Sequence, residues 1–427
     1  MANNMKTIFL ALIILIFLGS GFAYAGDYTS SAHGNSIEGV SGRLSDYGTG
    51  NCAHCHEQHA SVGGTEPAPI DGTPDEYLLF QDYRDTTYNS FCTDQCHDGT
   101  AARGDNIAAQ YAKSYHHPTT GVHTPGESTQ SAFGVRHGYC IDCHNPHVAK
   151  KIDRTLGSNL VSGGPLLKVS GVSVTNSTAW TAPSYAFIAA STGITKEYQL
   201  CFKCHSTWTT QPSGQTNIAM QFNTLNPSAH PVEAGLTASS SLKLTTSQML
   251  SPWNVLANMG VQTMYCSDCH GDDAAGTPPK GPHGSGSVGS VGGPKILKGR
   301  WPDNSSGHLW TLGDADATKA NDFDTECLCL NCHPVYDTAW KNNAHSDGAH
   351  PSTTKCVKCH VGLPHGSNLG RLIADETKGS PYDYNDLAEV RSFTKASNPV
   401  WYSKDNCTND PAGVAGCYSS SSPRYHD

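Results

Sequence analysis

The stretch that decides the fold is Cys140-Ile-Asp-Cys143-His144-Asn-Pro-His147. Two cysteines stand two residues apart, a histidine follows the second one directly, and another histidine comes three residues later. The C-x-x-C-H pattern occurs six times in the 427 residues, at Cys52–His56, Cys140–His144, Cys201–His205, Cys266–His270, Cys329–His333 and Cys356–His360. A random chain with 17 Cys and 22 His would contain about 0.03 such motifs, so this number is not accidental.

The motif is the attachment signature of c-type haem. Its two thiols reach the two vinyl groups of one porphyrin, and the adjacent histidine lies on the proximal side of the iron. Zinc is the alternative, because C-x-x-C supplies half of a tetrahedral zinc site. Zinc would need a second ligand pair for each motif and would not require a histidine directly after it. The pattern therefore favours haem.

A seventh candidate, C-x-x-x-C-H at Cys92–His97, has one extra residue between its cysteines. Its histidine lies 41 residues after His56 and 47 before His144, which keeps the series regular. We therefore predict seven haems c, or six if this motif is a disulfide or an unused pair. The predicted attachment residues are Cys52, Cys55, Cys92, Cys96, Cys140, Cys143, Cys201, Cys204, Cys266, Cys269, Cys329, Cys332, Cys356 and Cys359, and the predicted proximal ligands are His56, His97, His144, His205, His270, His333 and His360.

Three cysteines remain outside the motifs. Cys407 and Cys417 enclose nine residues in a Pro/Gly/Ser-rich tail, and in an oxidising compartment they are expected to form a disulfide. Cys327 is either a separate thiol or an alternative first thiol for the motif that ends at His333. The shorter Cys329 spacing is the safer choice.

The sixth iron position needs a second ligand. Beyond the leader the only methionines, Met220 to Met264, lie in one segment, so most distal ligands should be histidines, which predicts low-spin bis-His iron. Two kinds of histidine alternate along the chain, one just after a motif and one just before a proline. The predicted distal ligands are His59, His117, His147, His230, His283, His350 and His365. The reserves are His33, His116, His123, His137, His308, His345 and His426.

Residues 1–25 have the pattern of a secretory signal peptide. Lys6 precedes an apolar run, Thr7 to Leu18, and Ala23-Tyr24-Ala25 is a typical cleavage site. Removing this leader leaves 26 basic and 37 acidic residues, a net charge of −11. We therefore expect an exported protein with no membrane span, and the acidic balance argues against a nucleic-acid partner.

These motifs, with CHEQH, CHNPH, GPHGS and LPHGS, resemble those of multihaem c-type cytochromes of the doubled C-x-x-C-H class. Residues 52–365 are similar in particular to outer-surface cytochromes of metal-reducing bacteria, some of which form filaments. The resemblance implies a fold of loops and short helices around a chain of haems, with little strand. It also implies that His33, in an N-terminal segment that we expect to be flexible, is an inter-subunit ligand candidate.

The spacing of the motifs suggests a division into consecutive segments. They are 1–25, signal peptide; 26–75, haem 1; 76–150, haems 2 and 3; 151–290, haems 4 and 5; 291–370, haems 6 and 7; and 371–427, a haem-free C-terminal tail. A short hairpin is expected within the Ser/Thr-rich residues 169–195, and the Gly/Ser-rich residues 284–293 are typical of a linker.

The expected function is electron transfer through the haems, outside the cell or at its surface. Expected partners are other cytochromes, copies of the chain itself and extracellular electron acceptors. The alternatives are a multihaem reductase of a nitrogen or sulfur oxyanion and a periplasmic electron shuttle. A reductase needs an open distal site, and some such enzymes replace the motif histidine with lysine. Every motif here ends in histidine, so a carrier is favoured and no catalytic residue is assigned.

Overall fold

The computed structural model describes residues 25–56, 76–80, 90–100, 104–118, 137–152, 155–161, 163–235, 244–274, 281–286, 295–299, 328–333 and 360–375, and four two-residue strands after residue 388. The chain divides into two compact units. Unit 1 comprises Met1–Asp82, His144–Ile152 and Gly163–Leu167, and unit 2 comprises Tyr83–Cys143, Asp153–Ser162 and Lys168–Asp427. The third motif is therefore divided between Cys143 and His144.

The helices are few and short. The longest is α7 (Glu197–His205), with nine residues. The other α-helices are α2 (Ala25–Tyr28), α3 (Ser90–Thr93), α4 (Ala108–Tyr111), α6 (Cys140–Cys143) and α8 (Ile218–Gln221), and the 3₁₀ helices are η1 (Cys52–His54), η2 (Glu76–Leu78), η4 (Thr246–Gln248), η5 (Leu256–Asn258), η6 (Cys266–Asp268), η8 (Leu328–Asn331) and η11 (Gly370–Leu372). The 43 Gly and 24 Pro explain this, because both residues disfavour helix interiors. Among the described residues no helix has the length and apolar character needed to cross a membrane.

The strands form small antiparallel pairs. They are β1 (Tyr115–His116) with β5 (Gly284–Ser285), β2 (Gly171–Thr175) with β3 (Ser184–Ile188), β4 (Ser228–Ala229) with β6 (Gly366–Ser367), β7 (Glu389–Val390) with β9 (Cys407–Thr408), and β8 (Trp401–Tyr402) with β10 (Arg424–Tyr425). The β2–β3 pair confirms the hairpin expected within residues 169–195, in the register Gly171↔Ile188 to Thr175↔Ser184.

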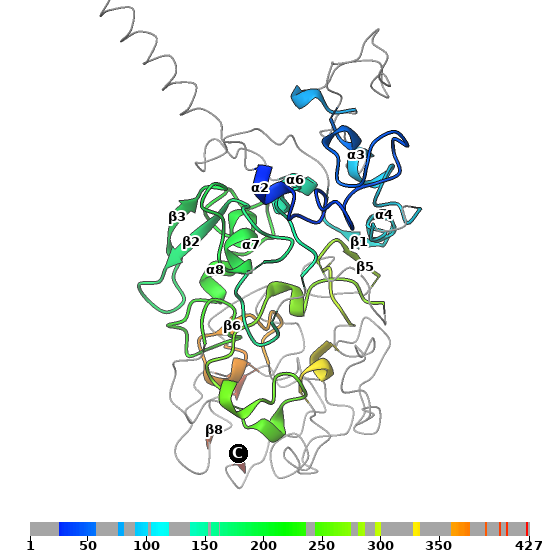
Figure 1. The fold of residues 1–427 in the computed structure, drawn as a ribbon. Coiled ribbons are helices and arrows are strands. Elements are labelled where there is room, and N and C mark those ends of the chain that lie inside the picture. Colours follow the sequence, from blue (N-terminus) through cyan, green and yellow to red (C-terminus); the bar gives the residue numbers. More distant parts are fainter. Residues whose placement is uncertain are drawn as a thin grey trace, which may run out of the picture. The chain divides into compact units, whose positions relative to one another are not determined.

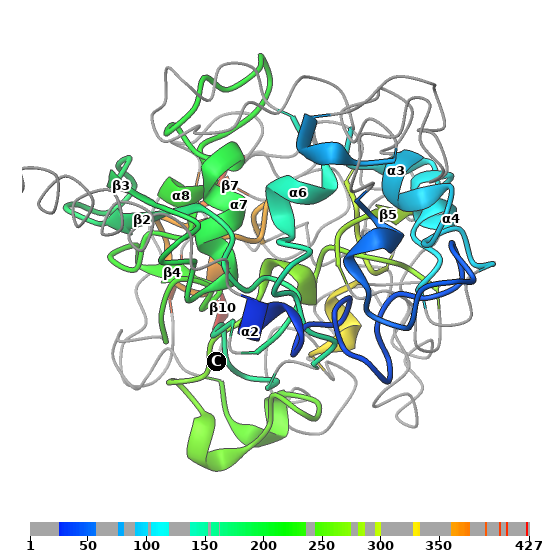
Figure 2. The same ribbon diagram turned by 45° about the horizontal axis from the view of Figure 1, so that its top comes forward.

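The main apolar core of unit 2 lies between this hairpin and α7, which are neighbours in both ribbon views (Figures 1 and 2). Val172 and Phe202 are fully buried there, and Trp208, Phe222 and Trp253 pack in the same cluster. Four attachment cysteines, Cys204, Cys266, Cys269 and Cys332, pack against this cluster. The core therefore fixes parts of the fourth, fifth and sixth motifs relative to one another.

Two of the strand pairs join segments that are far apart in the sequence. β1 pairs with β5 through His116↔Gly284, and β4 pairs with β6 through Ala229↔Gly366. The expectation that residues 284–293 are a linker is wrong for its first two residues, because Gly284 and Ser285 form β5 and are buried. The rest of that stretch, apart from Gly286, lies outside the described residues. Residue composition alone did not reveal that a distant strand pairs with this Gly-Ser sequence.

Candidate haem attachment sites

The six motifs whose cysteines are described begin in short helical turns. These turns are η1, α3, α6, α7, η6 and η8. In three C-x-x-C-H motifs the histidine N–H donates to the carbonyl of the first cysteine four residues earlier, at 2.9 Å for His56→Cys52 and 3.0 Å for His270→Cys266 and His333→Cys329. Side chains three residues apart lie on one face of such a turn, so the two thiols of a motif share a face.

The seventh candidate closes in an equivalent way despite its extra residue. The His97 N–H donates to the Cys92 carbonyl at 3.0 Å, five residues back instead of four. One residue inserted into a helical turn gives this wider ring. Positions four apart on a helix are also neighbours, so Cys92 and Cys96 can still share a face. The local geometry therefore fits an attachment site, as the regular spacing of the motifs predicts.

The motif cysteines are thiols, not disulfides, in all twelve positions that the structure describes. Cys52 is exposed and the others are partly accessible. Burial raises the pKa of the Cys143 and Cys332 thiols, so both remain protonated.

Successive motifs in unit 2 approach one another through their cysteines. The Cys92 thiol is hydrogen-bonded to Cys140, and the Cys201 thiol to Cys266. Burial is the main cause of the raised pKa of Cys143 and of Cys332. Cys204 raises the pKa of Cys143 further, and Cys269 does the same for Cys332, so the two cysteines of each pair lie close together. Attachment cysteines from the second to the sixth motif thus follow one another in chain order.

Most of the motif histidines have one ring nitrogen engaged by a backbone carbonyl. Nδ1 of His56, His97, His144, His270 and His360 lies 2.8–3.2 Å from the carbonyl oxygens of Tyr77, Asp105, Pro165, Ile296 and Arg371, respectively. Metal-ligating histidines donate their other ring N–H in this way, which fixes the tautomer and the ring orientation. Nε2 is the nitrogen left for a metal.

Two of these carbonyls come from unusual backbone turns. Tyr77 and Leu78 have φ of 67° and 57°, and Arg371 and Leu372 have φ of 60° and 57°. Non-glycine residues seldom adopt positive φ, and consecutive pairs cost free energy that the surrounding contacts must offset. In each case the turn delivers the carbonyl of its first residue to a motif histidine, which accounts for the same backbone shape in two distant places.

Four motif histidines lie beside a second histidine that the sequence predicts as a distal ligand. The distances between ring centroids are 6.0 Å for His56–His147, 6.2 Å for His117–His205, 6.4 Å for His230–His333 and 6.3 Å for His270–His365. A metal on a line between two imidazole nitrogens, with bonds of about 2 Å, separates the ring centroids by about 6.3 Å. The four pairs match that spacing.

Three of the four second histidines, His117, His230 and His365, are also oriented by Nδ1 contacts. His117 Nδ1 donates to the Pro282 carbonyl at 2.6 Å, and His230 Nδ1 donates to the Pro364 carbonyl. His365 Nδ1 donates to the side-chain oxygen of Gln221 at 2.6 Å. These distal candidates therefore present Nε2 just as the motif histidines do.

Burial favours the neutral form of several of these imidazoles. Among the paired histidines it lowers the pKa of His270 to about 4 and that of His333 to about 3, and it also lowers the pKa of His147, His230 and His365; the unpaired motif histidine His360 is affected in the same way. A neutral imidazole is the form that binds a metal. The surroundings of these rings thus favour the ligating form well below neutral pH.

Two other histidines show what an imidazole outside this set looks like. His54 is 1% exposed, and its Nε2 contacts the Gly48 carbonyl at 3.2 Å. His137 is 6% exposed, and its Nδ1 lies 2.9 Å from the Asp142 carboxylate. Each of the twelve described motif and distal candidates instead keeps accessible surface. His33 and His116, which also lie outside this set, keep accessible surface as well, so accessibility alone does not mark a ligand.

Some predicted residues lie outside the described ranges. They are His59, His350, Cys356, Cys359, Cys327 and Cys417, and of the β9 residue Cys407 only the backbone is described. The expected flexibility of the N-terminal segment is wrong, because Ala32 N–H donates to the Ala149 carbonyl at 2.7 Å and His33 Nδ1 lies 2.9 Å from the Pro146 carbonyl. These contacts, made about 115 residues along the chain, were not visible in the local sequence.

Within the described ranges no three His, Cys, Asp or Glu side chains gather as a metal-binding group. A haem iron takes four nitrogens from its porphyrin and needs only two from the protein, so histidine pairs are the relevant pattern. No family model, curated protein or solved structure matches this chain.

The sequence analysis missed the groups that orient the distal histidines. Two of these groups are the carbonyls of Pro282 and Pro364, which contact His117 and His230, and the Pro146 carbonyl contacts the reserve histidine His33 in the same way. Each of the three prolines directly precedes a predicted distal histidine. The signal was present as a repeated Pro-His dipeptide after the third, fifth and seventh motifs. Gln221 carried no such signal, because a lone glutamine in a short helix has no recognisable pattern.

Proposed function

We propose that this chain is an electron-transfer protein that holds seven c-type haems, mainly between pairs of histidines. One observation carries the proposal: each of four pairs with ring centroids 6.0–6.4 Å apart combines a motif histidine with a predicted distal histidine. Bound haem supplies reversible one-electron chemistry at its iron, with a potential set by the axial ligands and by burial.

The residues of the chain attach and orient the cofactor. The two thiols of each motif would hold one haem covalently, each through a thioether to one vinyl group, formed by addition of the S–H across the double bond without an oxidant. The carbonyls of Tyr77, Ile296 and Arg371 accept from Nδ1 of the motif histidines and direct Nε2 to the metal. These contacts prepare the sites before any partner binds.

The order of the attachment cysteines supports a conduit in which haems follow one another. Cys92 with Cys140, and Cys201 with Cys266, bring consecutive motifs together. Cofactors held on neighbouring thiols are close neighbours themselves, so electrons need no diffusing carrier between them. We therefore favour a carrier over a reductase of a nitrogen or sulfur oxyanion, which needs an open iron position.

We also propose that the chain acts outside the cell or at its surface, after export directed by residues 1–25. Its partners are other cytochromes, further copies of itself and extracellular electron acceptors. Fractionation of producing cells, with haem staining of each fraction, tests this location. Haem-stained protein confined to the periplasm would favour the shuttle alternative.

Intact mass of the exported protein tests the cofactor count. We expect seven covalent haems, and six in the double variant Cys92→Ala/Cys96→Ala. Six haems in both proteins would show that the C-x-x-x-C-H motif is not used. An exported protein without haem would overturn the proposal as a whole.

Paramagnetic resonance of the oxidised protein tests the ligands. We expect low-spin ferric signals from nearly all of the iron, because histidine is available on both sides. A stoichiometric high-spin signal in the pure protein would instead favour the reductase.

A further inference from the structure

Three places in the structure share one arrangement, which we call a histidine clamp. In each clamp a histidine from one segment donates Nδ1 to the carbonyl of a Pro-His dipeptide in another segment. Clamp 1 comprises residues 31–34 and 145–149, clamp 2 comprises residues 108–118 and 281–286, and clamp 3 comprises residues 218–231 and 363–369. Clamp 1 lies in unit 1, and clamps 2 and 3 lie in unit 2.

Clamps 2 and 3 agree in their backbone. The His117 N–H donates to the His283 carbonyl at 3.2 Å, and the His230 N–H donates to the His365 carbonyl at 3.0 Å. The strand after each Pro-His dipeptide is Gly-Ser, and each serine hydroxyl donates to a backbone carbonyl, at 2.5 Å from Ser285 to Leu297 and 2.6 Å from Ser367 to Ile373.

The two glycines of these strands have the same neighbour. A Cβ added at Gly284 would lie 1.9 Å from the Gln110 carbonyl oxygen, and one added at Gly366 would lie 1.9 Å from the Gln221 carbonyl oxygen. Each glutamine is followed by an aromatic residue that faces the clamp histidine, with ring centroids 6.4 Å apart for Tyr111–His283 and 4.7 Å for Phe222–His365. Clamps 2 and 3 are copies of one structural unit.

Clamp 1 repeats the side-chain contact with a different backbone register. His33 Nδ1 lies 2.9 Å from the Pro146 carbonyl, and the backbone bond is Ala32 N–H to the Ala149 carbonyl at 2.7 Å. Ser31-Ala32-His33 also repeats Ser228-Ala229-His230 of clamp 3. His33 therefore holds the place of His117 and His230, and His147 holds the place of His283 and His365.

Four of the six clamp histidines form a ring pair with a motif histidine, and we take each pair to indicate the motif that the clamp histidine serves. His147 follows the third motif and pairs with His56 of the first, and His365 follows the seventh motif and pairs with His270 of the fifth. A histidine after a motif thus serves the motif two places earlier. His283 follows the fifth motif, so the same displacement leads to the third.

In clamps 2 and 3 the other histidine pairs with a motif that comes later in the chain. His117 lies between the second and third motifs and pairs with His205 of the fourth, while His230 lies between the fourth and fifth and pairs with His333 of the sixth. Clamp 3 serves the fifth and sixth motifs, and moving back by two motifs makes clamp 2 serve the third and fourth.

We propose that every clamp presents two axial ligands to two different haems, so that His283 ligates the haem attached at Cys140 and Cys143. By the same equivalence, His33 is an axial ligand within its own chain, not an inter-subunit ligand. The inference rests on the proposed function. It is supported by Tyr111, whose ring centroid lies 6.4 Å from that of His283, and which lies close to the Cys140 and Cys143 thiols and, with a smaller effect, to Cys92 of the second motif.

The test for His283 compares His283→Met with His116→Met in the purified haem-loaded protein. His116 is the matched control, because it lies in the same clamp with its Nδ1 3.0 Å from the Lys113 carbonyl and belongs to none of the four pairs. We expect His283→Met to convert one haem in seven from bis-His to His–Met ligation, seen as a methionine–iron charge-transfer band and a raised potential for that haem. An unchanged spectrum, or the same change in the control, would overturn the assignment.

A second variant keeps the test usable if methionine is poorly accommodated. His283→Gly should give one high-spin haem in seven, and added imidazole should restore the low-spin signal by entering the vacated space. Iron that stays wholly low-spin in this variant would overturn the assignment. The haem count from intact mass distinguishes failure of the proposed function from failure of the clamp assignment. A wild-type protein without haem refutes the proposed function, whereas seven haems with an unchanged His283 variant refute only the clamp assignment.

For His33 the comparison is His33→Met against His54→Gln in monomers isolated by size exclusion. His54→Gln is the control because an amide nitrogen can keep the contact with the Gly48 carbonyl. We expect one haem in seven to change its ligand in the His33 variant while the protein is monomeric. A change confined to associated protein would assign His33 to a neighbouring copy and overturn the intrachain role.

Discussion

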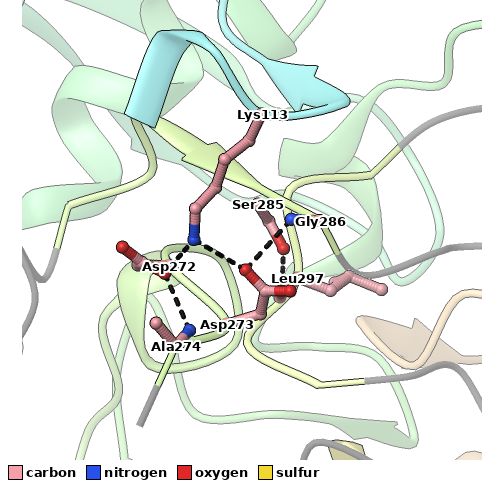
Figure 3. A network of polar contacts seen from close by, with 7 residues as sticks. All are labelled: Lys113, Asp272, Asp273, Ala274, Ser285, Gly286 and Leu297. Atoms are coloured by element: carbon pink, nitrogen blue, oxygen red, sulfur yellow. Dashed lines mark hydrogen bonds and ion pairs between the residues drawn. The ribbon is translucent and has the colours of Figure 1, made fainter. Parts of the chain in front are cut away.

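Clamps 2 and 3 hold their histidines on equivalent antiparallel strand pairs, β1–β5 and β4–β6, but different side chains support the two pairs. In clamp 2, Lys113 Nζ bonds to the carboxylates of Asp272 and Asp273, the latter at 2.9 Å, and Asp273 also accepts from the Gly286 N–H at 3.0 Å (Figure 3). In clamp 3 the corresponding support is neutral. The Ser228 hydroxyl donates to the Leu369 carbonyl at 2.5 Å and accepts from the Leu372 N–H at 2.8 Å.

The difference follows the length of chain that each clamp must hold. From the motif histidine to the carbonyl that accepts from it, the chain runs 26 residues in His270–Ile296 and only 11 in His360–Arg371. A longer connecting segment needs an additional contact near its ends. The ion pairs of Lys113 with Asp272 and Asp273, and the Gly286 N–H bond to Asp273, connect the residues after His270 to the residues just before β1 and to the residue that follows β5. The backbone pairing of the two clamps is therefore the same, whereas the side chains that support it differ with the length of chain to be held.

The strongest way to break both clamps is to fill their shared glycine positions. Gly284→Ala and Gly366→Ala should each lower the free energy of unfolding by about 3 kcal/mol, since the new Cβ would meet a backbone carbonyl that cannot turn away. Thermal unfolding of the haem-loaded protein measures this loss. Gly48→Ala is the control, because no atom lies within 4 Å of its Cβ position. A tolerated Gly284→Ala beside a damaging Gly366→Ala would show that the clamps are not equivalent.

Removing the lysine should damage clamp 2 alone. Lys113→Met leaves two carboxylates without their cation, and Asp272 is only 2% exposed, so we expect a loss of about 2 kcal/mol. Although burial lowers the pKa of Lys113, its hydrogen bonds to Asp272 and Asp273 raise it overall, so the amine stays charged at neutral pH. Denaturant unfolding, with the haem spectrum as a second probe, measures the effect. Lys113→Arg should keep most of the stability, and an equal loss in both variants would contradict the ion-pair explanation.

Titration of the Glu233 carboxyl, beside clamp 3, should make the free energy of unfolding depend on pH. Burial raises the pKa of Glu233 to about 7, although Asn176 donates to its carboxylate at 2.7 Å. The folded state therefore keeps the proton that the unfolded chain releases above its ordinary value of 4.5, and stability falls as pH rises from 4.5 to 7. Glu233→Gln should be more stable than the wild type by about 1.5 kcal/mol at pH 5.5 and by about 3 kcal/mol at pH 8, and nearly equal to it below pH 4.5. Unfolding curves across this range test the sign, and a constant difference would exclude titration as the cause.

The two clamp glutamines should respond in opposite directions. Gln221 accepts from His365 Nδ1, whereas the side-chain oxygen of its counterpart Gln110 is buried without a hydrogen-bond partner. Gln221→Leu should lower stability by about 1 kcal/mol, and Gln110→Leu should raise it by a similar amount. Calorimetry of the matched pair measures both changes. Two losses of equal size would mean that packing, not hydrogen bonding, decides the outcome.

The parts of the site that could be predicted were those written in short stretches of sequence. The motifs, the two alternating sets of histidines and the β2–β3 hairpin all depend on residues close to one another in the chain. Pairing could not be predicted, because His117 and His283 meet across 166 residues and nothing local records the contact. The same reason hid the strand character of Gly284-Ser285, which forms only because Tyr115-His116 lies beside it.

The positive-φ turns at Tyr77-Leu78 and Arg371-Leu372 could not be predicted from the sequence for a different reason. Positive φ is normally signalled by glycine or asparagine, and here tyrosine, arginine and leucine adopt it. The conformation is imposed by the contact with the motif histidine, not by residue preference. Such positions are visible only once the tertiary structure is known.

The long separations within the clamps also determine when each site can be completed. Tyr115 can pair with Ser285, and Ser228 with Ser367, only after the later residue has been synthesised. Each strand pair therefore closes a loop that contains several of the C-x-x-C-H motifs. Closing a loop of that length costs conformational entropy, and such non-local contacts form slowly. Under the proposed export from the N-terminal end, the thiols that a clamp serves emerge before the second segment of that clamp does. Covalent attachment should therefore come first, and each clamp should hold its proposed axial ligands only after its second segment, which ends at residue 149, 286 or 369, has emerged.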